Sequence, residues 1–108
     1  MKPVMLSLFV AAAVSAAQDK QAFTGIITDE MCPLGTHNHM RMGPTDAECV
    51  KACVVSHGSA YVLFDGKSAY VLSDQKTPEQ YAAQKVRVTG TLDAKTKTIR
   101  VESIAAIR

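Results

Sequence analysis

The second half of the sequence alternates apolar and polar residues with a period of two, which is the pattern of β-strands with one buried face. In KVRVTGTL (85–92), Val86 and Val88 alternate with polar residues, and TIRVESI (98–104) has the same alternation. Successive side chains of a strand point to opposite faces, so each run can bury one face of a sheet. The two runs predict a hairpin across DAKTK (93–97).

Three further runs are rich in β-branched and aromatic residues and predict the remaining strands. The first is AFTGIIT (22–28). The other two, AYVLF and SAYVL, flank the dipeptide Asp65-Gly66. This dipeptide is favoured in tight hairpin turns because both residues tolerate a positive φ. The two runs therefore predict a hairpin over residues 60–72.

A short helix is predicted between the hairpins, over TPEQYAAQ (77–84), because Thr77 can cap it and Pro78 suits the first helical position. The order of elements is then strand, inserted segment, two strands, short helix and two strands. This order predicts a mainly β fold, a small five-stranded OB-like barrel with one inserted helix and one short helix. A different small barrel and an open, strongly twisted sheet remain as alternatives, because periodicity alone cannot close a barrel.

Residues 1–17 predict a secretory signal peptide. Lys2 precedes the apolar run PVMLSLFVAAAVSAA, which ends in small residues and is followed by polar QDKQ. The run is shorter than the ~20 residues that span a bilayer. We expect cleavage after Ala16 or Ala17, a mature domain of residues 18–108 without a membrane span, and a periplasmic or secreted location. A chain of this size builds only one modest core, which a disulfide or a metal commonly reinforces.

The segment 28–58 is predicted as an insertion in this fold, and its second half predicts a helix. PTDAECVKACVVSHG begins with the capping box TDAE, and Gly58 can end the helix in the left-handed conformation. Cys49, Cys53 and His57 are spaced i, i+4 and i+8 on this helix. They therefore share one slowly drifting stripe.

A metal site is one prediction for the insertion. The stretch CPLGTHNHMRMG (32–43) holds one thiol, two imidazoles and two thioethers, close in sequence to the helical cysteines. Sulfur ligands suit Cu(I), and imidazole with thiolate suits copper or zinc, so the mixture favours copper over zinc. An extended loop would place the two histidines on one face and the two methionines on the other, so only a subset can bind together. The candidate ligands are Cys32, His37, His39, Met40, Met42, Cys49, Cys53 and His57.

A disulfide is the alternative interpretation of the same cysteines. Three cysteines in an exported protein indicate one disulfide and one leftover thiol. Cys49 and Cys53 lie on successive turns of one helix, where their side chains are poorly placed to bridge each other, so we expect Cys32 to pair with one of them. Closing that loop stabilises the fold by roughly 3 kcal/mol in the entropy model. A bridge that opens to release thiolates would make a redox-linked metal site.

The stretches FTGIITDEMC, DAECVKAC, AYVLFDG, YVLSDQ and VRVTGTLDAKTKTIRVESI span nearly the whole mature chain. Together they resemble a family of small secreted bacterial proteins of uncharacterised function. The resemblance implies an exported location and an OB-like barrel. It implies no activity.

Other functions have less support in the sequence. The net charge of +2 gives no strong attraction to nucleic acid or membranes. Asp29 and Glu30 are interpreted as turn charges, or as partners that orient a loop histidine, so we do not expect an enzyme. The alternative function is a monomeric, disulfide-stapled OB-fold interaction module that binds a protein, a saccharide or another ligand. The basic residues of the last hairpin are expected to point outward, where they form either a solvated face or the binding surface of such a module. They are Lys85, Arg87, Lys97 and Arg100.

Overall fold

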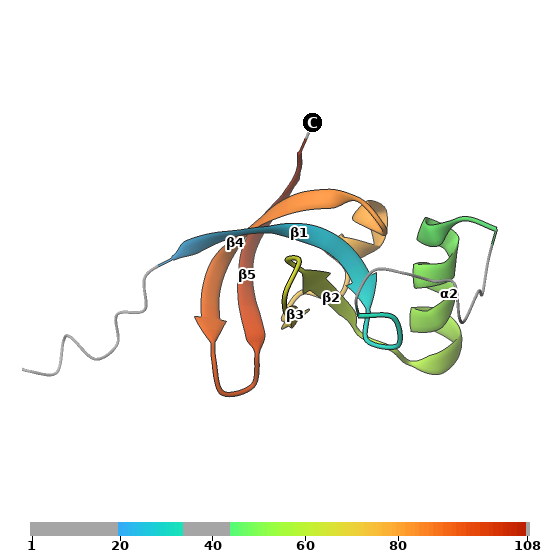
Figure 1. Cartoon of the computed structure of the whole chain (residues 1–108), viewed down its shortest axis with the longest axis horizontal. Helices are drawn as coiled ribbons and strands as arrows, with labels where there is room; N and C mark the ends of the chain where they lie inside the picture. Colours follow the sequence, from blue (N-terminus) through green and yellow to red (C-terminus); the bar gives the residue numbers. More distant parts are fainter. Residues whose placement is uncertain (1–19, 34–43, 108) are drawn as a thin grey trace, which may run out of the picture.

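The computed structural model describes residues 20–33 and 44–107, which form five strands, one α-helix and one short 3-10 helix (Figure 1). The predicted signal peptide, residues 1–17, lies outside the described residues. In the described part of the chain, no helix is long and apolar enough to cross a membrane. The elements are β1 (Gln21–Asp29), α2 (Asp46–His57), β2 (Tyr61–Phe64), β3 (Ala69–Leu72), η1 (Thr77–Tyr81), β4 (Lys85–Asp93) and β5 (Thr98–Ala106).

The five strands form a closed ring in the order β1-β2-β3-β5-β4. β1 pairs antiparallel with both β2 and β4, and β4 pairs antiparallel with β5. The ring closes because β3 pairs in parallel with β5, with Leu72 opposite Ile99. The prediction of a mainly β fold is confirmed. The alternative of an open, twisted sheet is wrong, because the pairing continues from each strand to the next around the whole ring.

Two glycines allow strands to approach closely where the sheet curves. A Cβ atom on Gly25 would collide with the carbonyl oxygen of Phe64, and one on Gly90 would collide with the carbonyl oxygen of Arg100. Only a residue without a side chain fits such crossings. The register of β4 and β5 also shifts between Thr89 and Gly90, and such an irregularity bends a strand.

The core lies inside the ring of strands and extends to α2. The alternation predicted for residues 85–92 is confirmed in its first half, where Val86 and Val88 are buried and Lys85 and Arg87 are exposed. Full burial of an aliphatic side chain contributes about 1.5–3 kcal/mol. The buried cluster consists of Ile27, Val50, Tyr61, Leu63, Leu72, Ala82, Val86, Val88 and Ile99.

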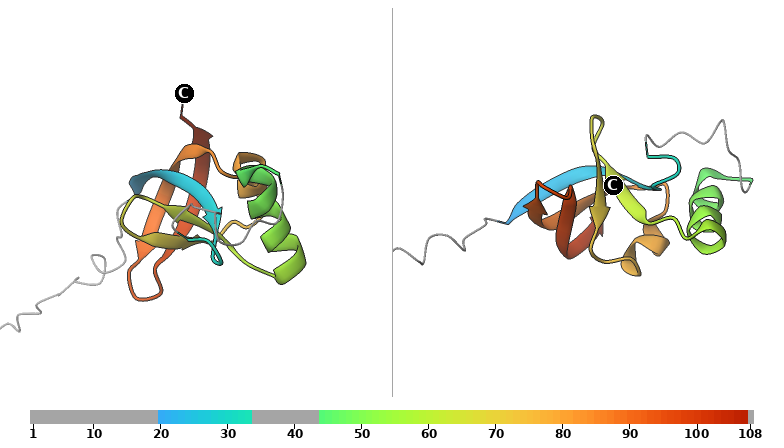
Figure 2. Two further views of the ribbon diagram at one scale, coloured as in Figure 1. Left: turned by 45° about the vertical axis from the view of Figure 1, so that its right-hand side comes forward. Right: turned by 90° about the horizontal axis from the view of Figure 1, so that it is seen from below.

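The inserted helix α2 begins and ends as predicted. The Thr45 hydroxyl accepts a hydrogen bond from the Glu48 N–H at 3.1 Å. Gly58 has φ 67°, the left-handed conformation, and its N–H donates to the carbonyls of Cys53 and Val54. In each view the helix lies outside the ring of strands, beside the end of β1 (Figure 1, Figure 2).

The loop between β2 and β3 differs from the predicted tight turn. It spans residues 65–68, and of Asp65 and Gly66 only the glycine has a positive φ, 104°. Asp65 acts through its side chain, because Oδ1 accepts from the N–H groups of Lys67 and Ser68, both at 2.8 Å. The aspartate therefore forms a side-chain turn and does not adopt the left-handed conformation.

The predicted helix over 77–84 is shorter than expected and has 3-10 geometry. It ends at Tyr81 because the next residues pair with β1: Ala82 bridges Ile27, and the Ala83 N–H donates to the Ile27 carbonyl at 2.8 Å. Thr77 is not its cap, since the cap position is Lys76, which makes no side-chain cap bond.

Candidate functional site

The chain folds back at the end of β1 and returns Cys32 to the sheet. The Cys32 N–H donates to the Asp29 carbonyl at 3.0 Å, and the Thr28 hydroxyl donates to the Cys32 carbonyl at 2.8 Å. Thr28 and Asp29 are fully buried, and Cys32 is 8% exposed. The turn therefore fixes a cysteine beside the last residue of the strand.

Helix α2 supplies the other two cysteines. Cys49 and Cys53 lie one turn apart and are both 0% exposed, on a helix that contacts β1. Ser59 ties the end of this helix to the strand. Its N–H donates to the Cys53 carbonyl at 3.3 Å, and its hydroxyl donates to Asp29 Oδ2 at 3.1 Å.

Asp29 is a buried carboxylate that uses one of its two oxygens. Oδ2 accepts from the Met31 N–H at 3.0 Å and from the Ser59 hydroxyl. Oδ1 is buried and receives no well-formed hydrogen bond from the described residues. Among those residues the ion pair joins Lys20 to Glu102 at the surface, so no described cation compensates Asp29.

Asp29 and Cys49 both act electrostatically on the thiols of Cys32 and Cys53. Burial raises the pKa of Cys32, and the negative charge of Asp29 and the neighbouring Cys49 raise it further. Burial raises the pKa of Cys53 to about 12, with contributions from Asp29, Cys49 and Cys32 and from the hydrogen bond that its thiol donates to Asp29. We call these four residues the thiol–carboxylate cluster. At neutral pH Cys32 and Cys53 stay protonated, which makes them poor nucleophiles.

The remaining predicted ligands do not join this cluster in the described structure. His57 is exposed at the end of α2. Because an α-helix turns about 100° per residue, residues four apart drift by about 40°. His57 has therefore left the face on which Cys49 and Cys53 are buried. The loop ligands His37, His39, Met40 and Met42 lie outside the described residues.

The described residues form neither a disulfide nor a metal-holding group. The structure records Cys32, Cys49 and Cys53 as thiols, so the disulfide through Cys32 stays a prediction. Within residues 20–33 and 44–107, no group of three His, Cys, Asp or Glu side chains is placed to hold a metal ion. Each thiol can turn about a single Cα–Cβ torsion, and three sulfurs with one oxygen are chemically suited to either redox or metal chemistry.

The sequence interpretation missed Asp29. It treated Asp29 and Glu30 alike, yet only Glu30 is exposed, where its carboxylate accepts from the Ala60 N–H at 3.2 Å. The period of two in the side-chain directions of a strand would have identified Asp29 as buried. Residues at i and i+2 face the same side, and Asp29 follows Gly25 and Ile27 on the buried face of β1.

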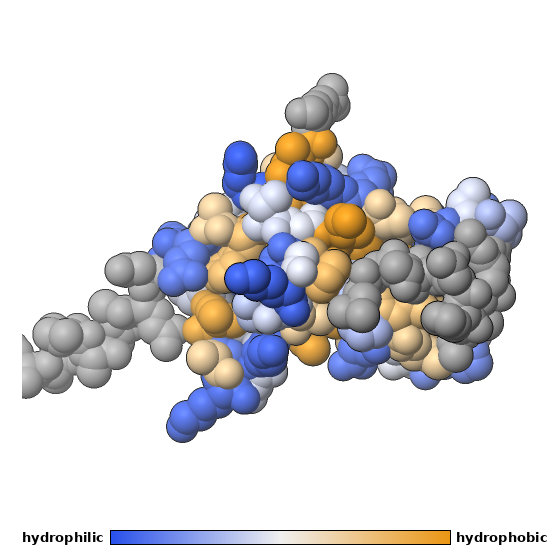
Figure 3. Space-filling view, viewed as in Figure 1, coloured by the Kyte–Doolittle hydropathy of each residue, from blue (hydrophilic) through white to orange (hydrophobic). Residues whose placement is uncertain are grey.

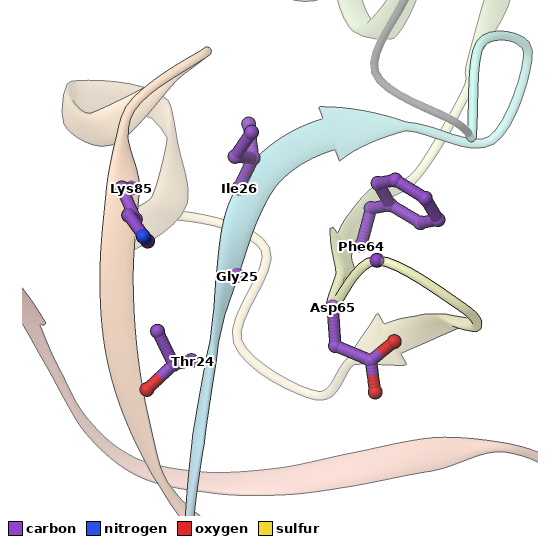
Figure 4. Close-up of a pocket in the computed structure, with 7 residues that line it drawn as sticks. Thr24, Gly25, Ile26, Phe64, Asp65 and Lys85 are labelled. Carbon is purple, nitrogen blue, oxygen red and sulfur yellow. The ribbon is translucent and has the colours of Figure 1, made fainter.

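A second candidate binding site lies beside the middle of β1. A pocket of about 360 Å³ is lined by β1, the β2–β3 loop and the start of β4 (Figure 4). Lys85 and Asp65 carry opposite charges at this pocket, and the N–H groups of Ser68 and Lys67 lower the pKa of Asp65. The lining residues are Thr24, Gly25, Ile26, Phe64, Asp65, Gly66 and Lys85.

No protein-family model, curated protein or solved structure matches the chain. The site is therefore interpreted from its own residues, and the family resemblance stays an expectation from the sequence.

Proposed function

We propose that this chain is an exported small protein that binds a soft transition metal at its cysteines, with copper expected first and zinc second. Export is supported by the signal-peptide pattern of residues 1–17. The observation that carries the metal proposal is that Cys32, from the turn after β1, is buried beside Cys49 and Cys53 of α2. Sulfur donors from separate segments of chain are thus available at one place.

The chemistry of the donors supports a transition metal. Thiolates bind copper and zinc, and the metal takes the place of the thiol protons. His37, His39, Met40 and Met42 follow Cys32 closely in the sequence and would add imidazole and thioether donors. Thioether and thiolate together suit Cu(I), which is the reason for expecting copper first.

We further infer that the closed sheet is an OB-like barrel. The inference is supported by the strand order β1-β2-β3-β5-β4, with β1 between β2 and β4 and with β3 parallel to β5. The segment that carries the cysteines connects β1 to β2. OB-folds commonly bind their ligands through this first connection, so its place in the fold agrees with a binding role.

The test is metal retention by the reduced, purified protein. After dialysis against Cu(I) or Zn²⁺ without oxygen, we expect the wild type to retain one metal ion and C32S, C49S and C53S each to bind it at least about tenfold more weakly. S56A is the matched control, since Ser56 is an exposed residue of the same helix. An absence of retained metal, or equal retention by the wild type and the three cysteine variants, would contradict the proposal.

The pocket beside Gly25 favours a second candidate, the disulfide-stapled interaction module. Its volume lies within the ~300–1,000 Å³ range of small-ligand pockets. Lys85 and Asp65 provide charges of both signs at this pocket. On the face of the molecule in Figure 3, hydrophilic and apolar residues are interspersed over the sheet. An intact-mass loss of two hydrogens, together with amide shifts at Thr24 and Phe64 on adding short oligosaccharides, would support it. A fully reduced protein without such shifts would contradict it.

A further inference from the structure

We propose that the first half of β1 is an open edge of the sheet that binds an extended, acidic peptide as an added strand, and that the pocket beside Gly25 receives one of its side chains. The inference goes beyond the metal function and does not depend on the cysteines. It assigns the pocket to a peptide, in place of the oligosaccharides considered for the interaction module.

The two edges of β1 are paired over different lengths. The first half of the strand pairs with β4, whereas pairing with β2 begins only at Ile26, opposite Phe64. β2 ends at this point and the chain turns back, with the Asp65 N–H donating to the Ser68 carbonyl at 3.0 Å. On the side of β2, residues 21–25 therefore have no strand opposite them in the described part of the chain.

The directions of the main-chain groups show which residues face this open edge. The Ile27 N–H donates to the Gln84 carbonyl at 3.1 Å, and the Ile27 carbonyl accepts from the Ala83 N–H at 2.8 Å, so both groups point toward the start of β4. The register of β1 and β4 is continuous, and successive residues of a strand direct these groups to opposite edges. The N–H and C=O groups of Ala22 and Thr24 therefore point to the open edge, where both residues are exposed.

A row of main-chain donors and acceptors at a sheet edge is complementary to another strand. A peptide that runs antiparallel to β1 can exchange hydrogen bonds with Thr24 and Ala22, in the place that a longer β2 would occupy. The pocket lies at one end of this edge, where Thr24, Gly25 and Phe64 line it (Figure 4). A saccharide can enter the pocket, but it has no regular row of amide groups to pair with the edge.

The charges around the edge favour an acidic peptide. Lys85 lines the pocket, Arg87 lies opposite Thr24 in β4, and Lys67 lies in the β2–β3 loop, all three exposed. None of these cations forms a salt bridge with a described residue. The one acidic residue of the pocket is Asp65, whose Oδ1 already accepts from N–H groups of its own loop. A second copy of this chain would bring the same cations to the edge, so like charges oppose dimerisation there.

The test measures binding of three synthetic peptides of equal length to the purified, reduced protein by titration of its amide NMR signals. One peptide alternates valine and glutamate, the second alternates valine and lysine, and the third is the glutamate peptide with N-methylated valines. We expect the glutamate peptide to shift the amide signals of Ala22 and Thr24 and to slow their hydrogen exchange. The lysine and N-methylated peptides should bind at least about tenfold more weakly, because they lose the charge attraction or the main-chain bonds.

Two variants place the peptide on this edge. T24P removes an N–H that points away from β4, and proline is tolerated at such an edge position, so the sheet keeps its pairing. It should bind the glutamate peptide about tenfold more weakly than T24A, the matched control that keeps the N–H. K85E should weaken binding of the glutamate peptide and strengthen binding of the lysine peptide. Circular dichroism verifies the fold of each variant.

The remaining outcomes overturn the inference. Equal binding of the glutamate and N-methylated peptides, or of the glutamate peptide to T24A and T24P, would show that the main-chain edge is not used. Shifts caused by short oligosaccharides and by none of the peptides would assign the pocket to saccharides. Concentration-dependent broadening at Ala22 and Thr24 without peptide would assign the edge to a second copy. If T24P does not fold, the N-methylated peptide and K85E decide. Metal retention by the cysteine variants tests the proposed function separately.

Discussion

Cys53 is buried beside a carboxylate that carries the same sign of charge as its own thiolate. Burial and Asp29 therefore act in the same direction and raise its pKa to about 12. Burial and Asp29 also raise the pKa of Cys32, which is 8% exposed. Protons thus compete with any metal for these sulfurs, and metal affinity should rise with pH.

The stability of the metal-free protein should fall at high pH because of Cys53. The thiol of the unfolded chain ionises near 9.0, whereas the folded thiol keeps its proton to about 12. The stabilisation from the buried Cys53 thiol is complete below the pKa of the unfolded thiol. It is lost as the pH rises from that pKa to the pKa of the folded thiol, because the unfolded state then binds fewer protons. Urea unfolding between about pH 8 and pH 11 should show a steeper loss for the wild type than for C53S. Equal slopes would contradict the burial of this thiol.

At the scale of elements, α2 connects the cysteines to the core. Val50 of this helix belongs to the same buried cluster as Ile27 of β1. The helix begins at the Thr45 cap and ends at Gly58, so its length and register determine where Cys49 and Cys53 are buried.

Removing the Thr45 cap should loosen this helix. T45A leaves the Glu48 N–H without its side-chain acceptor, and losses of this kind cost about 1 kcal/mol. Urea unfolding should show this decrease, whereas T45S, which keeps a hydroxyl, should unfold like the wild type. If both variants matched the wild type, the cap would not contribute to the stability of the helix.

The elements predicted from the sequence are those that depend on local physics. The strand at 85–92 and both ends of α2 follow from side-chain period and capping, and these are the parts that match the structure. The helix at 77–84 was predicted too long, because its last residues pair with β1, a contact distant in sequence. Asp29 was misread for a related reason: its residue type indicated a turn, while its place in the strand buried it.

At the scale of the whole molecule, closure of the sheet depends on close approaches that periodicity does not reveal. The cysteines could be named from their spacing, but their gathering around Asp29 depends on where α2 packs against β1. One such close approach lies at Gly90 of β4, where a Cβ atom would collide with the carbonyl oxygen of Arg100 in β5.

G90A should therefore weaken the whole fold. The added methyl group must displace the backbone of β5, and overpacking of this kind costs about 1–3 kcal/mol. Thermal unfolding should show a lower midpoint than for T91A, a change at the neighbouring half-buried position of the same strand. Equal midpoints would show that the two strands are further apart than described.

The central claim is that a metal binds among the buried cysteines, and zinc-edge X-ray absorption of the zinc-loaded wild type tests it most directly. We expect sulfur neighbours at about 2.3 Å from the zinc ion, contributed by Cys32, Cys49 and Cys53. A zinc shell made only of nitrogen and oxygen neighbours would contradict it.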